Sequence, residues 1–281
     1  MRNICLIMIV GLLIPLATNA AAPEPELIVV CYPGGGTINA KGANGAMSSM
    51  LRVVERIGQW GANSFNSLFT AKTDECRKQL AEINPKFAII SLGLYLELRA
   101  GHNFVPVVQP KIKGHASERF RVMAAKGKYK SLDELKGKTL GGTVLEDQAF
   151  VGRIVFAGKY DPGVFFDLKP SNQAIRALRA LDKGELDAVI LNEQQFDGLP
   201  SLHLETPLEA VFTSQEIPLM GVVADSGNTT QEERSRFGKA LEGMCADTEG
   251  KKLCELFGVD GFTAVDAAVF EPLVKLWAER K

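Results

Sequence analysis

Several features that mark common protein classes are scarce in these 281 residues. Histidine occurs only at His102, His115 and His203, and no Cys-x-x-Cys or Cys/His spacing suits zinc. This scarcity argues against a metal centre and against a histidine-based nucleophilic triad. Lys and Arg total 32 against 33 Asp and Glu, so the chain lacks the excess positive charge of nucleic-acid binders. We expect no metal, no cofactor and no nucleic-acid partner.

Long apolar runs are also missing, except at the amino terminus. Arg2 precedes an almost unbroken apolar stretch from Ile4 to Ala17, and Thr18-Asn19-Ala20 places short residues before a cleavage point. A membrane anchor would need about 20 apolar residues. We therefore predict a signal peptide over residues 1–20, cleaved after Ala20, and a soluble product exported to the periplasm.

Four of the five cysteines would remain after this cleavage. Cys245 and Cys254 are close in sequence and could close a short disulfide loop between two helices in an oxidising compartment, or they could stay reduced. Cys31 lies inside an apolar strand and Cys76 on a predicted helix. For these two, buried free thiols are the simpler interpretation.

Strand and helix patterns alternate along the rest of the chain. An apolar strand at 27–32 is followed by a glycine-rich turn at 33–36 and a helix at about 46–59. Later strands are expected at 64–69, 87–91, 138–141 and 187–191, with a helix from 147 to 157 and another starting at 174. Such alternation predicts parallel sheets covered by helices on both faces.

Two extended segments interrupted by prolines break this alternation, near residues 104–113 and 209–224. They bracket a middle block of about 100 residues, as expected for two lobes between which the chain crosses twice. We therefore predict that residues 21–110 and 217–281 form lobe 1 and that residues 111–216 form lobe 2.

Two elements of the middle block resemble a known family. One is YKSLDELKGKTLGGT, from Tyr129 to Thr143, which contains a predicted capping box from Ser131 to Glu134, and the other is GELDA, from Gly184 to Ala188. Together they resemble type 2 periplasmic solute-binding proteins, and most of all the phosphate/phosphonate-binding components of bacterial ABC transporters.

The resemblance implies an α/β fold of two lobes, each a mostly parallel sheet flanked by helices, joined by two crossing hinge strands. It implies a small-molecule ligand, an ABC transporter permease as partner, and no enzymatic activity; we also expect a monomer. Two alternatives remain open. One is a dehydratase-like enzyme of the same fold acting through Glu146 or Asp147, and the other is a binding subunit that serves a periplasmic enzyme or sensor.

The ligand of such a protein would lie between the lobes, at the carboxyl ends of the strands, where loops and helix starts converge. Each residue that follows a strand end is either a ligand contact or only a turn or cap residue. We predict ligand contacts from Gly34, Gly35, Gly36, Thr37, Asn39, Ser91 and Tyr95 in lobe 1, and from Thr143, Asp147, Gln148 and Asn192 in lobe 2.

Acidic residues complicate the choice of ligand. Phosphonate-binding relatives place a Ser/Thr cluster where this chain has Glu146 and Asp147, and two carboxylates would repel a dianion. Alternatively, both carboxylates complement the helix dipole and point to solvent. The ligand is therefore left open between a phosphonate, a zwitterion, an amine-bearing organic acid and an uncharged solute. The basic run from Lys111 to Lys138 is either a solvated face or a surface that attracts anions or acidic partners.

Overall fold

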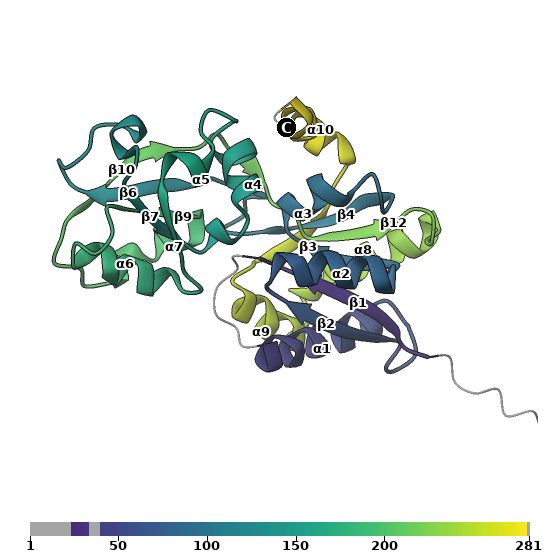
Figure 1. The fold of residues 1–281 in the computed structure, drawn as a ribbon. Helices are drawn as coiled ribbons and strands as arrows, with labels where there is room; N and C mark the ends of the chain where they lie inside the picture. The colour runs from purple at the N-terminus through teal and green to yellow at the C-terminus, as the bar shows by residue number, and fades with distance from the viewer. Residues whose placement is uncertain (1–23, 34–39, 280–281) are drawn as a thin grey trace, which may run out of the picture.

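The computed structural model describes residues 24–33 and 40–279 as two lobes lying side by side (Figure 1). The predicted signal peptide lies outside the described residues. None of the helices that are described is both long enough and apolar enough to cross a bilayer.

The first lobe is built on a six-stranded sheet in the order β13-β4-β12-β3-β1-β2. Its strands are β1 (Glu26–Cys31), β2 (Phe65–Thr70), β3 (Phe87–Ile90), β4 (Phe104–Lys111), β12 (Val222–Asp225) and β13 (Gly261–Ala264). Strand β1 pairs in parallel with β2 and β3. Strand β12 returns from the other lobe between β3 and β4 and is antiparallel to both, and β13 is antiparallel to β4.

The second lobe contains a five-stranded sheet in the order β10-β6-β9-β7-β8. Its strands are β6 (Arg121–Ala125), β7 (Thr139–Gly142), β8 (Asp167–Pro170), β9 (Ala188–Leu191) and β10 (Leu208–Thr213). Strand β7 is parallel to β8 and β9, whereas β6 is antiparallel to β9 and β10. The two-lobe α/β fold is thus confirmed. Both sheets are mixed rather than mostly parallel, because the strands next to the crossings run against their neighbours.

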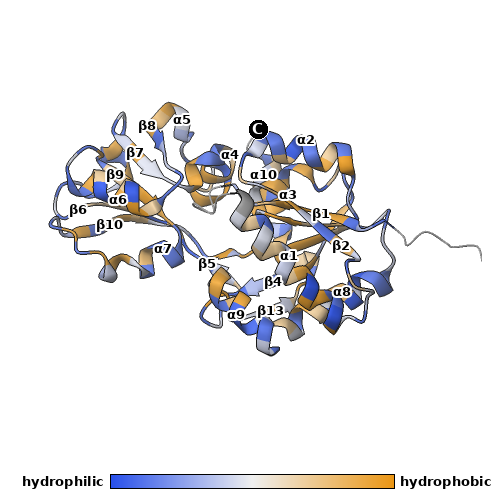
Figure 2. Ribbon diagram, turned by 90° about the horizontal axis from the view of Figure 1, so that it is seen from below, coloured by the Kyte–Doolittle hydropathy of each residue, from blue (hydrophilic) through white to orange (hydrophobic). Residues whose placement is uncertain are grey.

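Helices cover both faces of the larger sheet because β1 alternates its side chains between two cores. Ile28 and Val30 pack with one helix group, and Val29 and Cys31 pack on the opposite face. The first group is α1 (Ala40–Ile57), α8 (Gln231–Met244) and α9 (Thr248–Phe257), and the second is α2 (Thr73–Ile83), α3 (Leu92–Leu98) and α10 (Glu271–Glu279). Figure 2 shows apolar strands inside the lobes and hydrophilic stretches on α2 and α8.

The helices of the second lobe are short. They are α4 (Gln148–Phe150), α5 (Pro162–Phe165), α6 (Ala174–Asp182) and α7 (Glu193–Asp197). Helix α4 runs directly into a π-helix, η3 (Val151–Val155), so the single predicted helix at 147–157 is divided in two. Helix α1 begins six residues before its predicted start. Its first turns contain Gly42, Asn44 and Gly45, which are weak helix formers, so the sequence pattern did not indicate a helix there.

The predicted capping box at Ser131 is wrong. Residues Leu132–Leu135 form a 3₁₀ helix, the Ser131 side chain makes no cap hydrogen bond, and Glu134 Oε2 accepts instead from Lys130 N at 2.9 Å. A 3₁₀ turn is wound more tightly than an α-helix, so the geometry required by an α-helical cap is not present.

The GELDA element has a clear structural role, because Asp187 joins three segments of the second lobe. Its carboxylate accepts from Tyr129 Oη at 2.6 Å, Lys128 Nζ at 2.9 Å, and the Thr139 backbone and hydroxyl at 3.1 and 2.9 Å. Burial would raise the pKa of Asp187, but these hydrogen bonds outweigh burial and lower it. The element therefore fixes β7 beside β9.

A disulfide joins Cys245 to Cys254, with Cα atoms 5.8 Å apart, and so ties the end of α8 to α9. Cys31 and Cys76 are free and buried. The Cys76 thiol lies 3.8 Å from the Thr70 carbonyl oxygen, in the core beneath the end of β1.

Two short strands lie where the chain crosses between the lobes. Strand β5 (Ser117–Glu118) pairs antiparallel with β11 (Ile217–Pro218). This two-stranded ribbon contains both crossings and forms the hinge between the lobes.

Candidate functional site

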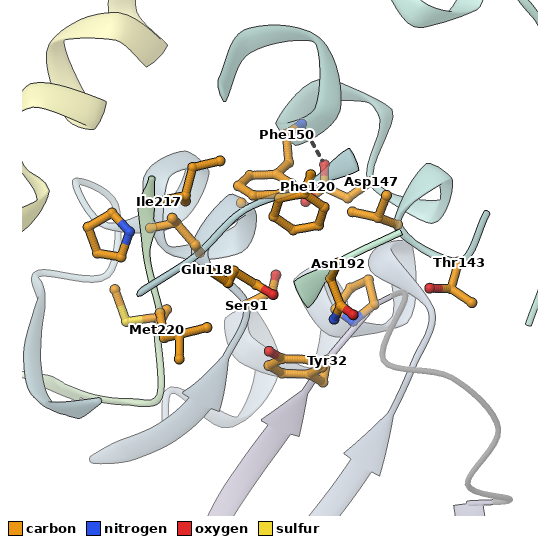
Figure 3. A pocket seen from close by; sticks show the side chains of 16 residues that line it. Tyr32, Ser91, Glu118, Phe120, Thr143, Asp147, Phe150, Asn192, Ile217 and Met220 are labelled. Atoms are coloured by element: carbon orange, nitrogen blue, oxygen red, sulfur yellow. Dashed lines mark hydrogen bonds between the residues drawn. The ribbon is translucent and has the colours of Figure 1, made fainter. Parts of the chain in front are cut away.

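A cavity of about 70 Å³ lies at the hinge and is lined by residues of both lobes (Figure 3). Tyr32 and Ser91 face it from the first lobe, Thr143 and Asn192 from the second, and Glu118 from the hinge. Its other lining residues are Pro33, Leu92, Gly93, Phe120, Val144, Asp147, Phe150, Ile217, Pro218, Leu219 and Met220. A space of this size holds about two water molecules. The cleft therefore contains a small, partly open chamber with polar and aromatic walls.

Three helices from both lobes begin at this cavity. Ser91 is the N-cap of α3 and its hydroxyl accepts from Leu94 N at 3.4 Å. Asn192 is the N-cap of α7 and accepts from Gln195 N at 2.9 Å, and Asp147 caps α4 by accepting from Phe150 N at 3.0 Å. Helix starts carry unpaired N–H groups, so polar groups from both lobes surround the same space.

The polar wall of the second lobe is held in place by a hydrogen-bond network. Gln195 Nε2 donates to Thr143 Oγ1 at 2.9 Å, and Gln195 Oε1 accepts from Asn192 N at 3.3 Å. This reciprocal capping box fixes Asn192 and Thr143 relative to each other. The two side chains therefore form a preorganised surface.

Aromatic rings supply the apolar wall. Phe120 and Phe150 meet edge to face with centroids 5.6 Å apart, and Tyr32 faces the cavity with 39% of its surface exposed. In Figure 3 the two phenylalanine rings lie together on one side of the cavity, with Tyr32 on the other. Such rings favour apolar or cationic groups placed between them.

The charge of the cavity is negative. Burial raises the pKa of Glu118 to about 7, while a hydrogen bond from the backbone of Glu193 acts in the opposite direction. Burial also raises the pKa of Asp147. The lining contains no Lys, Arg or His among the described residues. The described lining therefore presents two acidic groups and no basic one, although Arg77, outside the lining, acts to lower the pKa of Asp147.

Four of the nine Lys and Arg residues from Lys111 to Lys138 form ion pairs outside the cavity. Ion pairs join Lys113 to Asp197 at 2.6 Å, Arg119 to Glu216 at 3.7 Å, Arg121 to Glu193 at 3.0 Å and Lys128 to Asp187 at 2.9 Å. The first of these pairs joins the hinge region to the second lobe, the Arg119 pair lies within the hinge, and the other two lie within the second lobe. They place none of the four cations in the cavity wall.

The lobes touch directly beside the cavity. A Cβ on Gly93 would lie 2.0 Å from an Asp147 carboxylate oxygen, and the Thr73 hydroxyl lies 3.3 Å from the Glu146 carbonyl oxygen. At the carboxyl end of the described chain, the Arg153 guanidinium stacks 4.8 Å from the Trp277 ring. Helix α10 thus contacts the second lobe as well as α3 of the first.

The structure brings four of the predicted site residues together at the cavity: Ser91, Thr143, Asp147 and Asn192. Tyr95 lies one helical turn beyond Ser91, where it is 2% exposed and packs edge to face on Phe270 at 5.6 Å. Gln148 is exposed on a separate surface hollow between the lobes. Gly34, Gly35, Gly36, Thr37 and Asn39 lie outside the described residues.

Among the lining residues that the sequence analysis did not predict are Tyr32, Glu118 and Phe120. Tyr32 directly follows β1, so the strand-end rule could have found it. Glu118 lies in the hinge strand β5 and Phe120 follows it, whereas the sequence analysis expected the crossing near residues 104–113 and assigned both residues to lobe 2. Glu146, by contrast, is exposed and outside the cavity.

A metal site is not indicated by the described part of the chain, since no group of three or more His, Cys, Asp and Glu side chains is placed to hold an ion. The polar groups of the cavity are hydroxyls, an amide and two carboxylates from separate elements.

The family model and two similar structures all point to phosphonate-binding proteins. Residues 50–270 match the family model for the periplasmic substrate-binding protein of phosphonate ABC transporters. A binding protein component of an ABC phosphonate transporter from Pseudomonas aeruginosa is similar in structure, with a TM-score of 0.69 and 17% identity over 92% of this chain and 87% of that one. A Prochlorococcus marinus protein in complex with methylphosphonate gives 0.65 and 12% over 91% and 98%.

Two other matches are to proteins that are not described as phosphonate-binding. A Xanthomonas citri protein bound to ATP has a TM-score of 0.67 and 14% identity over 90% of this chain and 96% of that one. An ancillary SecYEG translocon subunit of Neisseria gonorrhoeae is 31% identical over 86 residues, and the match spans 31% of this chain and 41% of that relative. The chain therefore spans less than half the length of this curated relative.

Proposed function

The chain belongs to the family of periplasmic substrate-binding proteins of phosphonate ABC transporters, and from this premise we propose that it captures a small solute in the hinge cavity and delivers it to an ABC permease. The solute-binding role follows from the family and from its structural relatives. The proposal adds that the mature protein acts in the periplasm after removal of residues 1–20. It also adds that the lobes divide near residues 110 and 217.

One observation carries this proposal: the cavity at the hinge is lined by the cap residues of helices from both lobes, Ser91 on one side and Asp147 and Asn192 on the other. A solute bound there would contact both lobes at once. Binding would therefore favour the closed arrangement, which is the shape a permease can distinguish from the empty protein.

The enzymatic alternative has no support from the cavity. Glu146 is exposed outside it, and Asp147 is engaged as a helix cap by accepting from Phe150 N. We propose that the chain is not an enzyme.

Thermal denaturation in the presence of small solutes tests the proposal. A solute at 100 times its Kd stabilises the folded protein by about 2.7 kcal/mol, which raises Tm by several degrees for a chain of this size. A library of phosphonates, amino acids, amines and neutral solutes should contain at least one such stabiliser. Small-angle scattering should then show a smaller radius of gyration with that solute present.

A matched pair of variants separates binding in the cavity from binding elsewhere. Ser91→Tyr fills the cavity and removes an N-cap hydroxyl, whereas Thr230→Tyr makes the same type of change at the N-cap of α8, outside the cavity. Each variant should lose about 1 kcal/mol of stability from the cap. Only Ser91→Tyr should abolish the response to the solute. A library without any stabiliser, or a response that survives Ser91→Tyr, would contradict the proposal.

A further inference from the structure

The hinge cavity opens beside a second, larger cavity of about 440 Å³. The two share Tyr32, Glu118, Asn192, Leu219 and Met220, which form the boundary between them. The larger cavity is walled mainly by apolar side chains of the first lobe, among them Met47, Met50, Phe69 and Val222. The smaller chamber could hold only a small polar head, while the larger one has the volume of a small-molecule site.

Glu118 is the charged residue at this boundary. Its neighbours in sequence, Arg119 and Arg121, pair with Glu216 and Glu193 rather than with Glu118. No Lys, Arg or His among the described residues lines either cavity. A partly buried carboxylate without a cationic partner is unfavourable, and a cation brought by a ligand would relieve that cost.

The other groups around the smaller chamber also suit a cation. Asp147 adds a second carboxylate, and the rings of Tyr32, Phe120 and Phe150 offer aromatic surface. Carboxylates and aromatic faces are the usual partners of ammonium groups. Among the described lining residues, a phosphonate dianion would find hydroxyl, amide and backbone donors but no cation, opposite two acidic groups.

One basic residue near the hinge retains an unused donor. Arg121 Nη1 is buried without a hydrogen-bond partner in the described structure. However, its guanidinium stacks 4.1 Å from the Phe196 ring and pairs with Glu193, and Arg121 lines neither cavity. It is therefore not placed to neutralise an anion in the cleft.

We infer that the solute of this protein is an organic cation with an apolar substituent, whose ammonium group lies beside Glu118 and whose apolar part occupies the larger cavity. The inference rests on the proposed solute-binding function and specifies the chemical class of the solute. It gives this chain a different ligand class from the phosphonate-binding proteins whose fold it shares.

Titration calorimetry with a set of matched probes tests the inference at pH 8.0, where Glu118 is mostly ionised because its pKa is about 7. The probes are 2-phenylethylammonium, ethylammonium, 3-phenylpropanoate, 3-phenylpropan-1-ol and methylphosphonate. We expect 2-phenylethylammonium to bind at least 10-fold more tightly than ethylammonium, which lacks the apolar part. It should also bind at least 10-fold more tightly than the carboxylate and the alcohol, which lack the positive charge.

Variants test whether the ammonium group of the probe lies beside Glu118 and whether its phenyl group occupies the larger cavity. Glu118→Gln should weaken 2-phenylethylammonium at least 10-fold and leave the alcohol unchanged, whereas Glu185→Gln, at an exposed carboxylate far from both cavities, should change neither. Met47→Trp narrows the larger cavity and should reduce the preference for 2-phenylethylammonium over ethylammonium. Circular dichroism establishes that each variant is folded.

The outcomes distinguish this inference from the function on which it rests. Binding of methylphosphonate without binding of any amine overturns the cation inference and leaves the solute-binding function standing. Equal binding of the ammonium and the carboxylate probes overturns it as well, as does full affinity in Glu118→Gln. Absence of binding by all five probes also overturns it, and the broader solute library described above then decides the solute-binding function separately.

Discussion

Asp147 of the second lobe rests directly on Gly93 of the first, so closely that a Cβ on Gly93 would lie 2.0 Å from Asp147 Oδ2. Asp147 has little freedom to retreat, because its other carboxylate oxygen caps α4 by accepting from Phe150 N at 3.0 Å. Phe150 also approaches, with its Cβ 2.9 Å from the added atom. The lobes can meet here only because residue 93 has no side chain.

Gly93→Ala should therefore hold the lobes apart. We expect a larger radius of gyration in small-angle scattering and at least 10-fold weaker binding of whichever solute stabilises the wild-type protein. Gly45→Ala is the matched control, because nothing lies within 4 Å of a Cβ there and alanine in α1 should add up to about 1 kcal/mol of stability. Equal scattering curves for the two variants would contradict the role assigned to Gly93.

The raised pKa of Glu118 should make the free energy of unfolding decrease as pH rises from about 4.5 to about 7. Its pKa is about 7 in the folded protein against 4.5 as the ordinary value, so the folded state holds a proton that the unfolded state has lost between these two pH values. Stability from this group is therefore complete below about pH 4.5 and declines up to about pH 7. Glu118→Gln removes the effect, whereas the charge of Glu193, which also raises the pKa of Glu118, remains.

Urea unfolding of the wild-type protein and Glu118→Gln at several pH values measures this difference. The free energy of unfolding of the variant, minus that of the wild type, should increase between pH 4.5 and 7 and then level off. A difference that is independent of pH would mean that Glu118 titrates at its ordinary value.

Asp187→Asn should destabilise the second lobe. The substitution removes the charge that accepts from Lys128, Tyr129 and Thr139, at a cost of about 1–3 kcal/mol. The lowered pKa of Asp187 means that its contribution is present above the ordinary value of 3.8 and is lost as pH falls below it. Asp167→Asn, at an exposed pair with Lys169, should cost less than about 0.5 kcal/mol in the same urea titrations.

The disulfide between Cys245 and Cys254 should contribute about 2–3 kcal/mol, because it closes a loop with a sequence separation of 9. The double variant Cys245→Ser/Cys254→Ser should lower Tm by several degrees in thermal denaturation. Dithiothreitol should lower the Tm of the wild-type protein to a similar value and leave the double variant unchanged. A reductant-sensitive double variant would contradict the assignment.

The thiols of Cys31 and Cys76 should be unreactive in the folded protein. Both side chains are 0% exposed, and the hydrogen bond between the two thiols together with burial raises the pKa of Cys31. Because only the thiolate reacts readily, Ellman's reagent at pH 8 should modify neither until denaturant is added. Rapid modification of the native protein would contradict the buried environment.

Much of the fold could be predicted because local pattern and burial agree. The apolar strand before Tyr32 and the strand at Ala188–Leu191 are continuous apolar runs, and they form central strands. The antiparallel return of β12 between β3 and β4 could not be predicted, because its direction is set by where the chain crosses the hinge and not by its own residues.

The site was predictable at strand ends and helix caps, and not beyond them. Ser91, Thr143 and Asn192 follow strands, so the rule that ligands bind at the carboxyl ends of strands applies to them. Glu118 lies on the hinge ribbon, where two distant segments pair and only the folded structure places its carboxylate between the lobes.

The contact between Arg153 and Trp277 gives the protein a built-in optical reporter. The chain has two tryptophans, and Trp60 packs within the first lobe against Phe65 and Phe237, whereas the ring of Trp277 is covered by a cation of the opposite lobe. Separation of the lobes would expose this indole alone to water. Intrinsic emission from a Trp60→Phe protein should then follow opening in real time, without an attached dye.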